Sequence, residues 1–411
     1  MALVGAPGIH LVLRASRGPG SARSRGRRAV TATRAHVVWT DRFLDYDFGP
    51  HHPFTERSRG LAARLLEEAL ATAPSDTVGW TRSVKVADRA TLETFHRAEY
   101  LEFVESASGL AKQLLLDSGD TPSFPGCYEA SARLVQGAID ALDFTLEHRQ
   151  PAFHPAGGLH HAHPQRASGF CIFNDVAIAV AHALKKGHRV AYIDIDAHHG
   201  DGVMYGFYDS GRVLDIDFHQ DGRTLFPGTG FPYEVGRGDG AGLKANLPFP
   251  PGAGDEALLP VFRRVVPALL QQFRPDVIVL QHGVDGHFGD EIAHLQYSPR
   301  AYAEVDRMVL ALAKELTRGR LLVTGGGGYR AESVSRVLAR AGVILAGLPE
   351  PPDHTALPAP WRKEFRTTFG REAPETWGDA WEPEPSPWTD ADERALVAQL
   401  ESKLGEKLSV P

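Results

Sequence analysis

The sequence has few of the residues that would cross-link it or hold it in a membrane. Among its 411 residues are two cysteines, Cys127 and Cys171, which excludes a framework of several disulfides and a zinc site built from thiolates. This cysteine usage fits a reducing compartment, so we expect a cytoplasmic protein. No apolar run reaches the ~20 residues that a membrane-spanning helix needs. We therefore expect no membrane partner.

An excess of positive charge is also absent. The formal net charge is −7, which gives no reason to expect nucleic acid as an obligate partner. Residues 1–34 are the exception, because they carry many arginines and no acidic residue. Such a stretch is typical of a mitochondrial presequence, of a disordered tail, or of an extension from a misassigned start codon. We favour a disordered or spurious extension and leave it out of the predicted fold.

Strand and helix patterns alternate along the remaining chain. This alternation predicts one α/β domain over residues 35–350, with a mostly parallel sheet covered on both faces by helices. Residues 351–411 form a Pro- and Trp-rich tail that ends in a helix. The predicted strands are 36–40, a short one at the start of 84–106, 189–195, 212–218, 276–281 and 320–324, and the predicted helices include 128–147, 175–186, 255–273, 299–318, 331–347 and 390–405.

Polar side chains follow three of these strands. Asp196 and His198 come after the strand at 189–195, Asp285 after 276–281, and Tyr329 after 320–324. Ligands of open parallel sheets bind at the carboxyl ends of the strands. Two carboxylates and an imidazole in a desolvated place need a cation or a proton to offset their charge. Three protein ligands with an open position are typical of catalytic zinc, so we predict a metal held by Asp196, His198 and Asp285.

Further groups near these residues are suited to proton transfer. The pair His160–His161 can take a proton from water if each imidazole is oriented by a carboxylate, and Asp194 and Asp201 are the spare acids beside the predicted ligands. Tyr329 follows Gly325–Gly328, and a tyrosine hydroxyl there can donate to a developing oxyanion. The alternatives are a surface or core role for the histidines and a packing role for the tyrosine.

Aromatic residues next to glycines offer walls for a binding slot. Gly169 with Phe170, and Phe226 in the Gly/Pro-rich stretch 219–254, can enclose an extended apolar chain, although core packing explains them equally well. Asp120 lies in the Gly/Pro loop 116–128, where an aspartate is most simply a turn residue.

Six short motifs carry a family resemblance. They are HHA at 160–162, GFCIFND at 169–175, DIDAHHGDG at 194–202, FPGTG at 226–230, GVD at 283–285 and GGGGY at 325–329. In this order they resemble the zinc-dependent histone deacetylase superfamily, with its arginase/deacetylase fold. The segments at 46–53 and 357–365 are more similar to the bacterial acetoin-utilisation deacetylases. The resemblance covers roughly residues 36–365.

The resemblance implies a role for each candidate residue. It implies Zn²⁺, with Fe²⁺ as an alternative, at Asp196, His198 and Asp285. His161 would be the general base and acid, His160 its electrostatic partner, Tyr329 the oxyanion donor, and Asp194 and Asp201 would orient the two histidines. A structural K⁺ or Na⁺ would lie at Asp194, Asp196, His198, Asp217 and Phe218, where the family often has serine in place of Asp217. Gly169, Phe170 and Phe226 would form the acetyl-lysine tunnel, and Asp120 would hold the substrate backbone at its rim.

The implied activity is hydrolysis of N-acetyl-lysine amides in proteins, with release of acetate. A deacetylase of small amines such as acetylpolyamines would use the same catalytic set, so the partner is an acetylated protein or a small acetylated amine. A metal-bound acetyl-lysine-binding protein without turnover and an arginase-like two-manganese hydrolase are further alternatives. The acidic chain does not support a role on chromatin.

Overall fold

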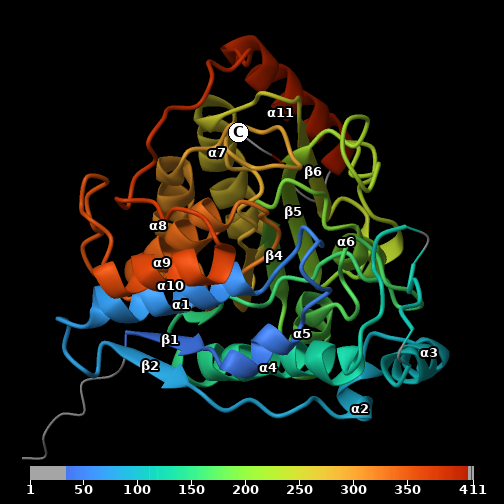
Figure 1. Ribbon diagram of the computed structural model, residues 1–411. Coiled ribbons are helices and arrows are strands. Elements are labelled where there is room, and N and C mark those ends of the chain that lie inside the picture. Colours follow the sequence, from blue (N-terminus) through green and yellow to red (C-terminus); the bar gives the residue numbers. More distant parts are fainter. Residues whose placement is uncertain (1–33, 111, 118, 406–408, 410–411) are drawn as a thin grey trace, which may run out of the picture. The chain divides into compact units, whose positions relative to one another are not determined.

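The computed structural model describes residues 34–110, 112–117, 119–405 and 409. All of the predicted N-terminal extension except Arg34 therefore lies outside the described residues. The eight strands of the described chain form one all-parallel sheet in the order β2-β1-β3-β8-β7-β4-β5-β6 (Figure 1). The strands are β1 Ala35–Val38, β2 Val78–Thr81, β3 Ala152–His154, β4 Val190–Asp194, β5 Val213–Gln220, β6 Lys244–Phe249, β7 Val277–Gln281 and β8 Leu321–Thr324.

Helices pack against both faces of this sheet. Helix α4 contacts α5, β1 and β3 in one layer, whereas in the other α1 contacts α9, α9 contacts α8 and α8 contacts α7 (Figure 1). The predicted α/β architecture is therefore confirmed. The α-helices are α1 Arg57–Leu70, α2 Arg89–Leu92, α3 Ala98–Ser108, α4 Cys127–His148, α5 Asp175–Lys185, α6 Asp201–Gly206, α7 Asp255–Phe273, α8 Pro299–Leu316, α9 Ala331–Leu345, α10 Ala359–Phe369 and α11 Asp390–Leu404.

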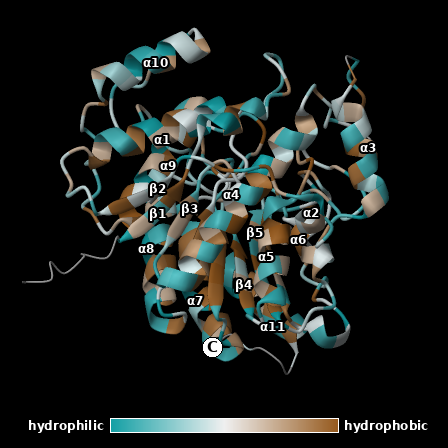
Figure 2. Cartoon of the chain, turned by 90° about the horizontal axis from the view of Figure 1, so that it is seen from below, coloured by the Kyte–Doolittle hydropathy of each residue, from teal (hydrophilic) through white to brown (hydrophobic). Residues whose placement is uncertain are grey.

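Every residue of the central strands β4, β5 and β7 is buried, because helices cover both faces of the sheet. Strands buried in this way carry β-branched and aliphatic runs, which are nearly continuous in β4 and β7 and are interrupted in β5 by the buried Asp215, Asp217 and His219. Figure 2 shows the inner strands mostly in the hydrophobic colour, whereas the outer helices mix both colours. These runs explain why the three strands could be predicted from the sequence.

The structure corrects the prediction at the edges of the sheet. Residues 84–86, where a short strand is predicted, form none, and β2 is the edge strand instead. The Val84 carbonyl accepts a hydrogen bond from the Arg133 guanidinium at 2.6 Å. Strand β3 has three residues and was not predicted. Strand β6 lies inside the predicted excursion 219–254 and contains Lys244 and Pro248, which hide its strand pattern. Helix α10 lies in the tail and was also not predicted.

The C-terminal helix α11 agrees with its predicted pattern. The Thr389 side chain accepts the Asp392 N–H while the Asp392 carboxylate accepts the Thr389 N–H, which is a capping box. Leu396, Leu400 and Leu404 are buried, and the helix packs on α7 and β6. No described helix is both long enough and apolar enough to cross a membrane.

We expect Gly137→Ala to destabilise the fold. Gly137 lies in the middle of α4, where alanine is normally favoured, but a β-carbon there would come 2.6 Å from His154 Cε1 and 2.9 Å from Phe43 Cζ. His154 has little freedom to move, because its Nε2 is 3.1 Å from the Leu134 carbonyl oxygen. Overpacking of this kind costs about 1–3 kcal/mol, measured by denaturant unfolding.

The control for this variant is Gly119→Ala. A β-carbon at Gly119 meets nothing within 4 Å, so this change should leave the free energy of unfolding nearly unaltered. A stabilised Gly137→Ala protein would contradict the close packing of α4 on β3.

Candidate active site

The candidate site lies at the carboxyl edge of four adjacent strands. In the sheet order β3-β8-β7-β4, His160 and His161 follow β3, Tyr329 follows β8, Asp285 follows β7, and Asp196 follows β4. The parallel direction of the strands brings these segments to one edge, although they are up to about 170 residues apart in the chain. The topology therefore assembles the side chains that the sequence analysis predicted as a site.

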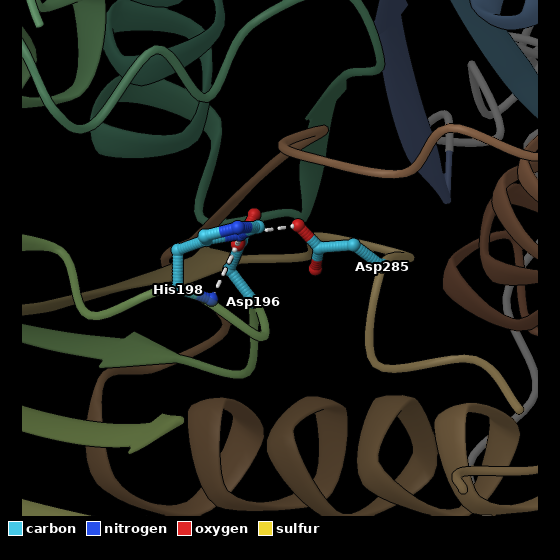
Figure 3. A group of neighbouring side chains, drawn as sticks. All are labelled: Asp196, His198 and Asp285. Atoms are coloured by element: carbon cyan, nitrogen blue, oxygen red, sulfur yellow. Dashed lines mark hydrogen bonds and ion pairs between the residues drawn. The ribbon is translucent and has the colours of Figure 1, made fainter. Parts of the chain in front are cut away.

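Asp196, His198 and Asp285 converge on one point (Figure 3). The His198 Nδ1 atom lies 2.8 Å from Asp285 Oδ2 and 3.2 Å from Asp196 Oδ1. The other oxygen of each carboxylate is fixed by the backbone, because the Gly327 N–H donates to Asp196 Oδ2 and the Ala197 N–H donates to Asp285 Oδ1, both at 2.7 Å. One oxygen of each carboxylate and one imidazole nitrogen thus remain to hold a cation.

The charge of this group fits a divalent metal. All three side chains are buried, and burial together with repulsion from Asp196 raises the pKa of Asp285 to about 7. The ligand atoms of Asp196 and Asp285 lie within 4.8 Å of each other, and two buried carboxylates this close repel each other unless a positive charge lies between them. Two oxygen ligands and one nitrogen ligand with an open side are a donor set that catalytic zinc accepts.

Each of the two adjacent histidines is held by its own carboxylate. His160 Nδ1 lies 2.9 Å from Asp194 Oδ2, and His161 Nδ1 lies 2.7 Å from Asp201 Oδ1. The two Nε2 atoms point toward each other at 3.0 Å. The pair is also next to the metal-binding group, because His160 Nε2 is 3.8 Å from Asp196 Oδ1.

The two histidines differ in their affinity for a proton. Burial lowers the pKa of His160, but the Asp196 and Asp194 carboxylates outweigh it and raise that pKa to about 10. Burial and the positive charge of His160 lower the pKa of His161 to about 4. At neutral pH, His160 is therefore an imidazolium, and His161 is neutral, with its hydrogen on Nδ1 toward Asp201 and an unprotonated Nε2.

Tyr329 lies beside this group at the end of β8. Its ring centroid is 6.2 Å from that of His198, and its backbone N–H donates to Asp290 Oδ2 at 2.9 Å. Burial, followed by repulsion from the Asp285 and Asp196 carboxylates, raises the pKa of the Tyr329 hydroxyl well above its usual value. The hydroxyl therefore stays protonated and is available as a donor.

The predicted tunnel residues lie beside His161 and Tyr329. The Phe226 ring centroid is 5.1 Å from that of His161, and the Phe170 centroid is 5.9 Å from that of Tyr329. Gly169 lies between the walls, because a β-carbon there would come 2.5 Å from His161 Cδ2 and 2.8 Å from Phe226 Cε1. The side chain of Phe226 is 43% exposed, which places this wall at the entrance.

Asp120 is connected to the same entrance through its neighbours. It is exposed, and its carbonyl oxygen lies 3.2 Å from His52 Nε2. The adjacent Thr121 hydroxyl accepts the Phe170 N–H at 3.0 Å. A role of Asp120 at the rim stays a prediction.

The predicted monovalent-cation residues lie behind the metal-binding group. Asp217 Oδ2 accepts the Gly200 N–H at 2.8 Å, and Asp217 Oδ1 lies 2.6 Å from His219 Nδ1. Phe218 is buried against Phe262, with ring centroids 5.2 Å apart. Both Asp217 oxygens already have partners, so the cation site remains a prediction that would depend mainly on backbone carbonyls.

Three residues at the site were missed by the sequence analysis. His163 Nε2 lies 3.0 Å from Asp201 Oδ2, so Asp201 bridges His161 and His163. Asp175 accepts the N–H groups of Gly158 and Leu159, which precede the histidine pair. The Arg59 guanidinium donates to the carbonyls of Gly326 and Gly328. Proximity to HHA was a signal for His163, but nothing in the sequence connects Arg59 to the glycines.

Comparison with known families agrees with this geometry. The profile described as "Histone deacetylase domain" matches residues 52–344. The chain belongs to the histone deacetylase family. It is therefore placed among hydrolases of the deacetylase class, and the resemblance stated from the motifs is confirmed.

Two curated relatives and one solved structure show the extent of the similarity. The acetoin utilization protein AcuC of Bacillus subtilis (strain 168) is 35% identical over 355 residues, covering 83% of this chain and 89% of that protein. AcuC of Staphylococcus xylosus is 32% identical over 381 residues, covering 90% and 96%. The crystal structure of the HDA15 HD domain matches with a TM-score of 0.69 at 25% identity, covering 82% of this chain and 95% of that one.

We expect His163→Phe to lower kcat and His163→Gln to restore most of it. Phenylalanine keeps the ring that stacks near Tyr205, at a centroid distance of 6.4 Å, but it cannot donate to Asp201. The glutamine amide can donate from nearly the same position. Loss of an outer partner of this kind typically costs about 10–100-fold. Steady-state deacetylation kinetics measure the effect, and equal kcat values for the two variants would contradict a role for the hydrogen bond.

Proposed function

We propose that this protein hydrolyses N-acetyl-lysine amides in proteins and releases acetate, using one zinc ion held by Asp196, His198 and Asp285. The observation that carries this proposal is the pair of Nε2 atoms of His160 and His161, which converge beside the metal-binding group. A neutral imidazole and an imidazolium at that point are the groups that amide hydrolysis needs.

The chemistry of the proposed zinc ion and of the protein side chains is complementary. Zinc at this position supplies Lewis-acid polarisation of the acetyl carbonyl and of water. His161 accepts a proton from the attacking water at Nε2, while Asp201 holds its Nδ1–H and stabilises the imidazolium that forms. The same proton then passes to the leaving lysine amine, so the amide and water become an amine and acetate.

His160 and Tyr329 stabilise the negative charge that develops on the acetyl carbonyl oxygen. His160, whose Nδ1 lies 2.9 Å from Asp194 Oδ2, keeps its proton and lowers the energy of a nearby oxyanion. The Tyr329 hydroxyl, which stays protonated, donates a hydrogen bond to that oxyanion. Phe170 and Phe226 exclude water around the lysine side chain, and Gly169 keeps the space between His161 and Phe226 free of a side chain.

The arginase-like alternative is less well supported by the contacts. A second metal would need His160 and Asp201 to face it, but His160 binds Asp194 and Asp201 binds His161 and His163. Within the described residues, one group of three side chains fits a metal. A cytoplasmic location remains part of the proposal and rests on two cysteines, Cys127 and Cys171, that are not bonded to each other.

We expect His161→Ala to lower kcat on an acetyl-lysine peptide by about 10²–10⁴-fold, the usual contribution of a general base. The control is His148→Ala, which removes an exposed histidine at the end of α4. Zinc content should stay at that of the wild type in both variants. An unchanged kcat for His161→Ala would contradict the assigned base.

Acetate release from an acetyl-lysine peptide and from an acetylpolyamine tests the substrate class. We expect turnover of the peptide that a chelator abolishes and Zn²⁺ restores, since Asp196, His198 and Asp285 need a cation between them. Turnover of the acetylpolyamine but not of the peptide would support the same hydrolysis with a small acetylated amine as the substrate. Zinc binding without turnover of either substrate would favour an acetyl-lysine-binding protein without catalysis. Turnover that Fe²⁺ restores and Zn²⁺ does not would identify iron as the catalytic metal.

A further inference from the structure

The tail segment 376–381 lies against the two loops that carry Asp285 and Tyr329. We propose that Asp379 in this segment is a positioning residue that fixes these two loops relative to each other. This inference rests on the proposed roles of Asp285 as a metal ligand and Tyr329 as an oxyanion donor. It makes the Pro- and Trp-rich tail that follows the predicted domain at residues 35–350 part of the active-site scaffold.

The Asp379 carboxylate connects the loop after Asp285 with helix α9, which follows the Tyr329 loop. Its Oδ2 atom lies 3.1 Å from His287 Nε2, and its Oδ1 atom accepts a hydrogen bond from an Arg336 NH2 group at 2.6 Å. His287 is two residues beyond Asp285, whereas Arg336 is in the second turn of α9, which begins two residues beyond Tyr329. All three side chains are at most 5% exposed, so solvent does little to weaken these contacts.

The hydrogen bonds fix the orientation of His287. Its Nδ1 atom accepts the Gly289 N–H at 3.0 Å, so its Nε2 atom carries the hydrogen and donates to Asp379. The His287 N–H donates to the Val284 carbonyl at 3.1 Å. One imidazole therefore ties the tail to the turn that immediately surrounds Asp285.

Arg336 and Trp381 hold the same tail segment to the other loop. Besides binding Asp379, the Arg336 guanidinium donates to the carbonyls of Trp377 and Gly378. The Arg330 guanidinium lies 4.4 Å from the Trp381 ring centroid, and the Phe288 centroid lies 5.7 Å from it. Trp381 is thus packed between the residue after Tyr329 and the loop after Asp285.

A second contact joins the two loops on the side of the active site. Asp290 Oδ2 accepts the Tyr329 N–H at 2.9 Å, and Asp290 N–H donates to the His287 carbonyl at 2.8 Å. The loops are therefore joined at Asp290, at Asp379 and by the Val284 N–H, which donates to the Gly327 carbonyl at 2.9 Å. Removing the Asp379 connection loosens the outer side of this junction, and a misplacement of about 1 Å between reacting groups can cost about 10²-fold in rate.

The test is Asp379→Asn, which keeps the size of the side chain but leaves one acceptor oxygen for two donors. The expected result is a fall in kcat of about 10–100-fold with KM within about twofold, and a weaker Zn²⁺ affinity by competition with a chelator. The matched control is Asp353→Asn. Asp353 binds Arg340 on the same helix at 2.7 Å, but its side chain is 72% exposed.

Trp381→Leu provides a second variant that does not depend on a buried charge. Because Trp381 is 43% exposed, the fold should survive, and we expect a smaller fall in kcat in the same direction. The proposal is overturned if folded Asp379→Asn protein keeps the wild-type kcat and Zn²⁺ affinity, or if Asp353→Asn loses as much. An inactive wild-type protein would contradict the proposed function instead, while the Zn²⁺ affinities would still test the positioning role.

Discussion

Four carboxylates are buried at the carboxyl edge of the sheet, and the surrounding backbone is arranged around them. Asp194, Asp196, Asp217 and Asp285 are almost without exposure, and ionised groups in such surroundings must be hydrogen-bonded or neutralised. Each of them accepts a backbone N–H, from Asp196, Gly327, Gly200 and Ala197 respectively. Three of these bonds cross between strands, so the carboxylates also hold β5 and the loops after β4, β7 and β8 together.

The same charges separate the two histidines into different protonation states. His160 faces Asp194 and Asp196, so its proton is stabilised, whereas His161 faces His160 and loses its proton. Asp201 raises the pKa of His161, but burial and the charge of His160 outweigh it. Two identical side chains that are adjacent in the sequence can thus act as a base and as a fixed positive charge.

The sequence predicts those parts of the site that lie at the ends of long apolar strands. An apolar run such as that of β4 predicts a buried strand, and polar residues directly after it are then recognised as candidates for a site because they are unexpected in a core. Strand β3 has three residues and β6 contains a buried lysine whose Nζ donates to the Val213 carbonyl at 2.8 Å, so neither has a readable pattern. Contacts such as His163 with Asp201 and Asp379 with His287 depend on tertiary packing, which leaves no periodic signal.

Gly327 and Gly283 are explained by the carboxylates more than by a ligand, whereas Gly325 and Gly328 lie close to Pro155 and Val334. A β-carbon at Gly327 would lie 2.0 Å from Asp285 Oδ2, and one at Gly283 would lie 2.0 Å from Asp196 Oδ2. Any side chain at either position would displace a carboxylate from the point where the three donor atoms converge. At Gly327 the backbone therefore approaches Asp196 and Asp285 closely, and its N–H donates a hydrogen bond to Asp196. The position of Tyr329 depends on this constraint, because Gly327 is bonded to Asp196 and Tyr329 is only two residues further along the chain.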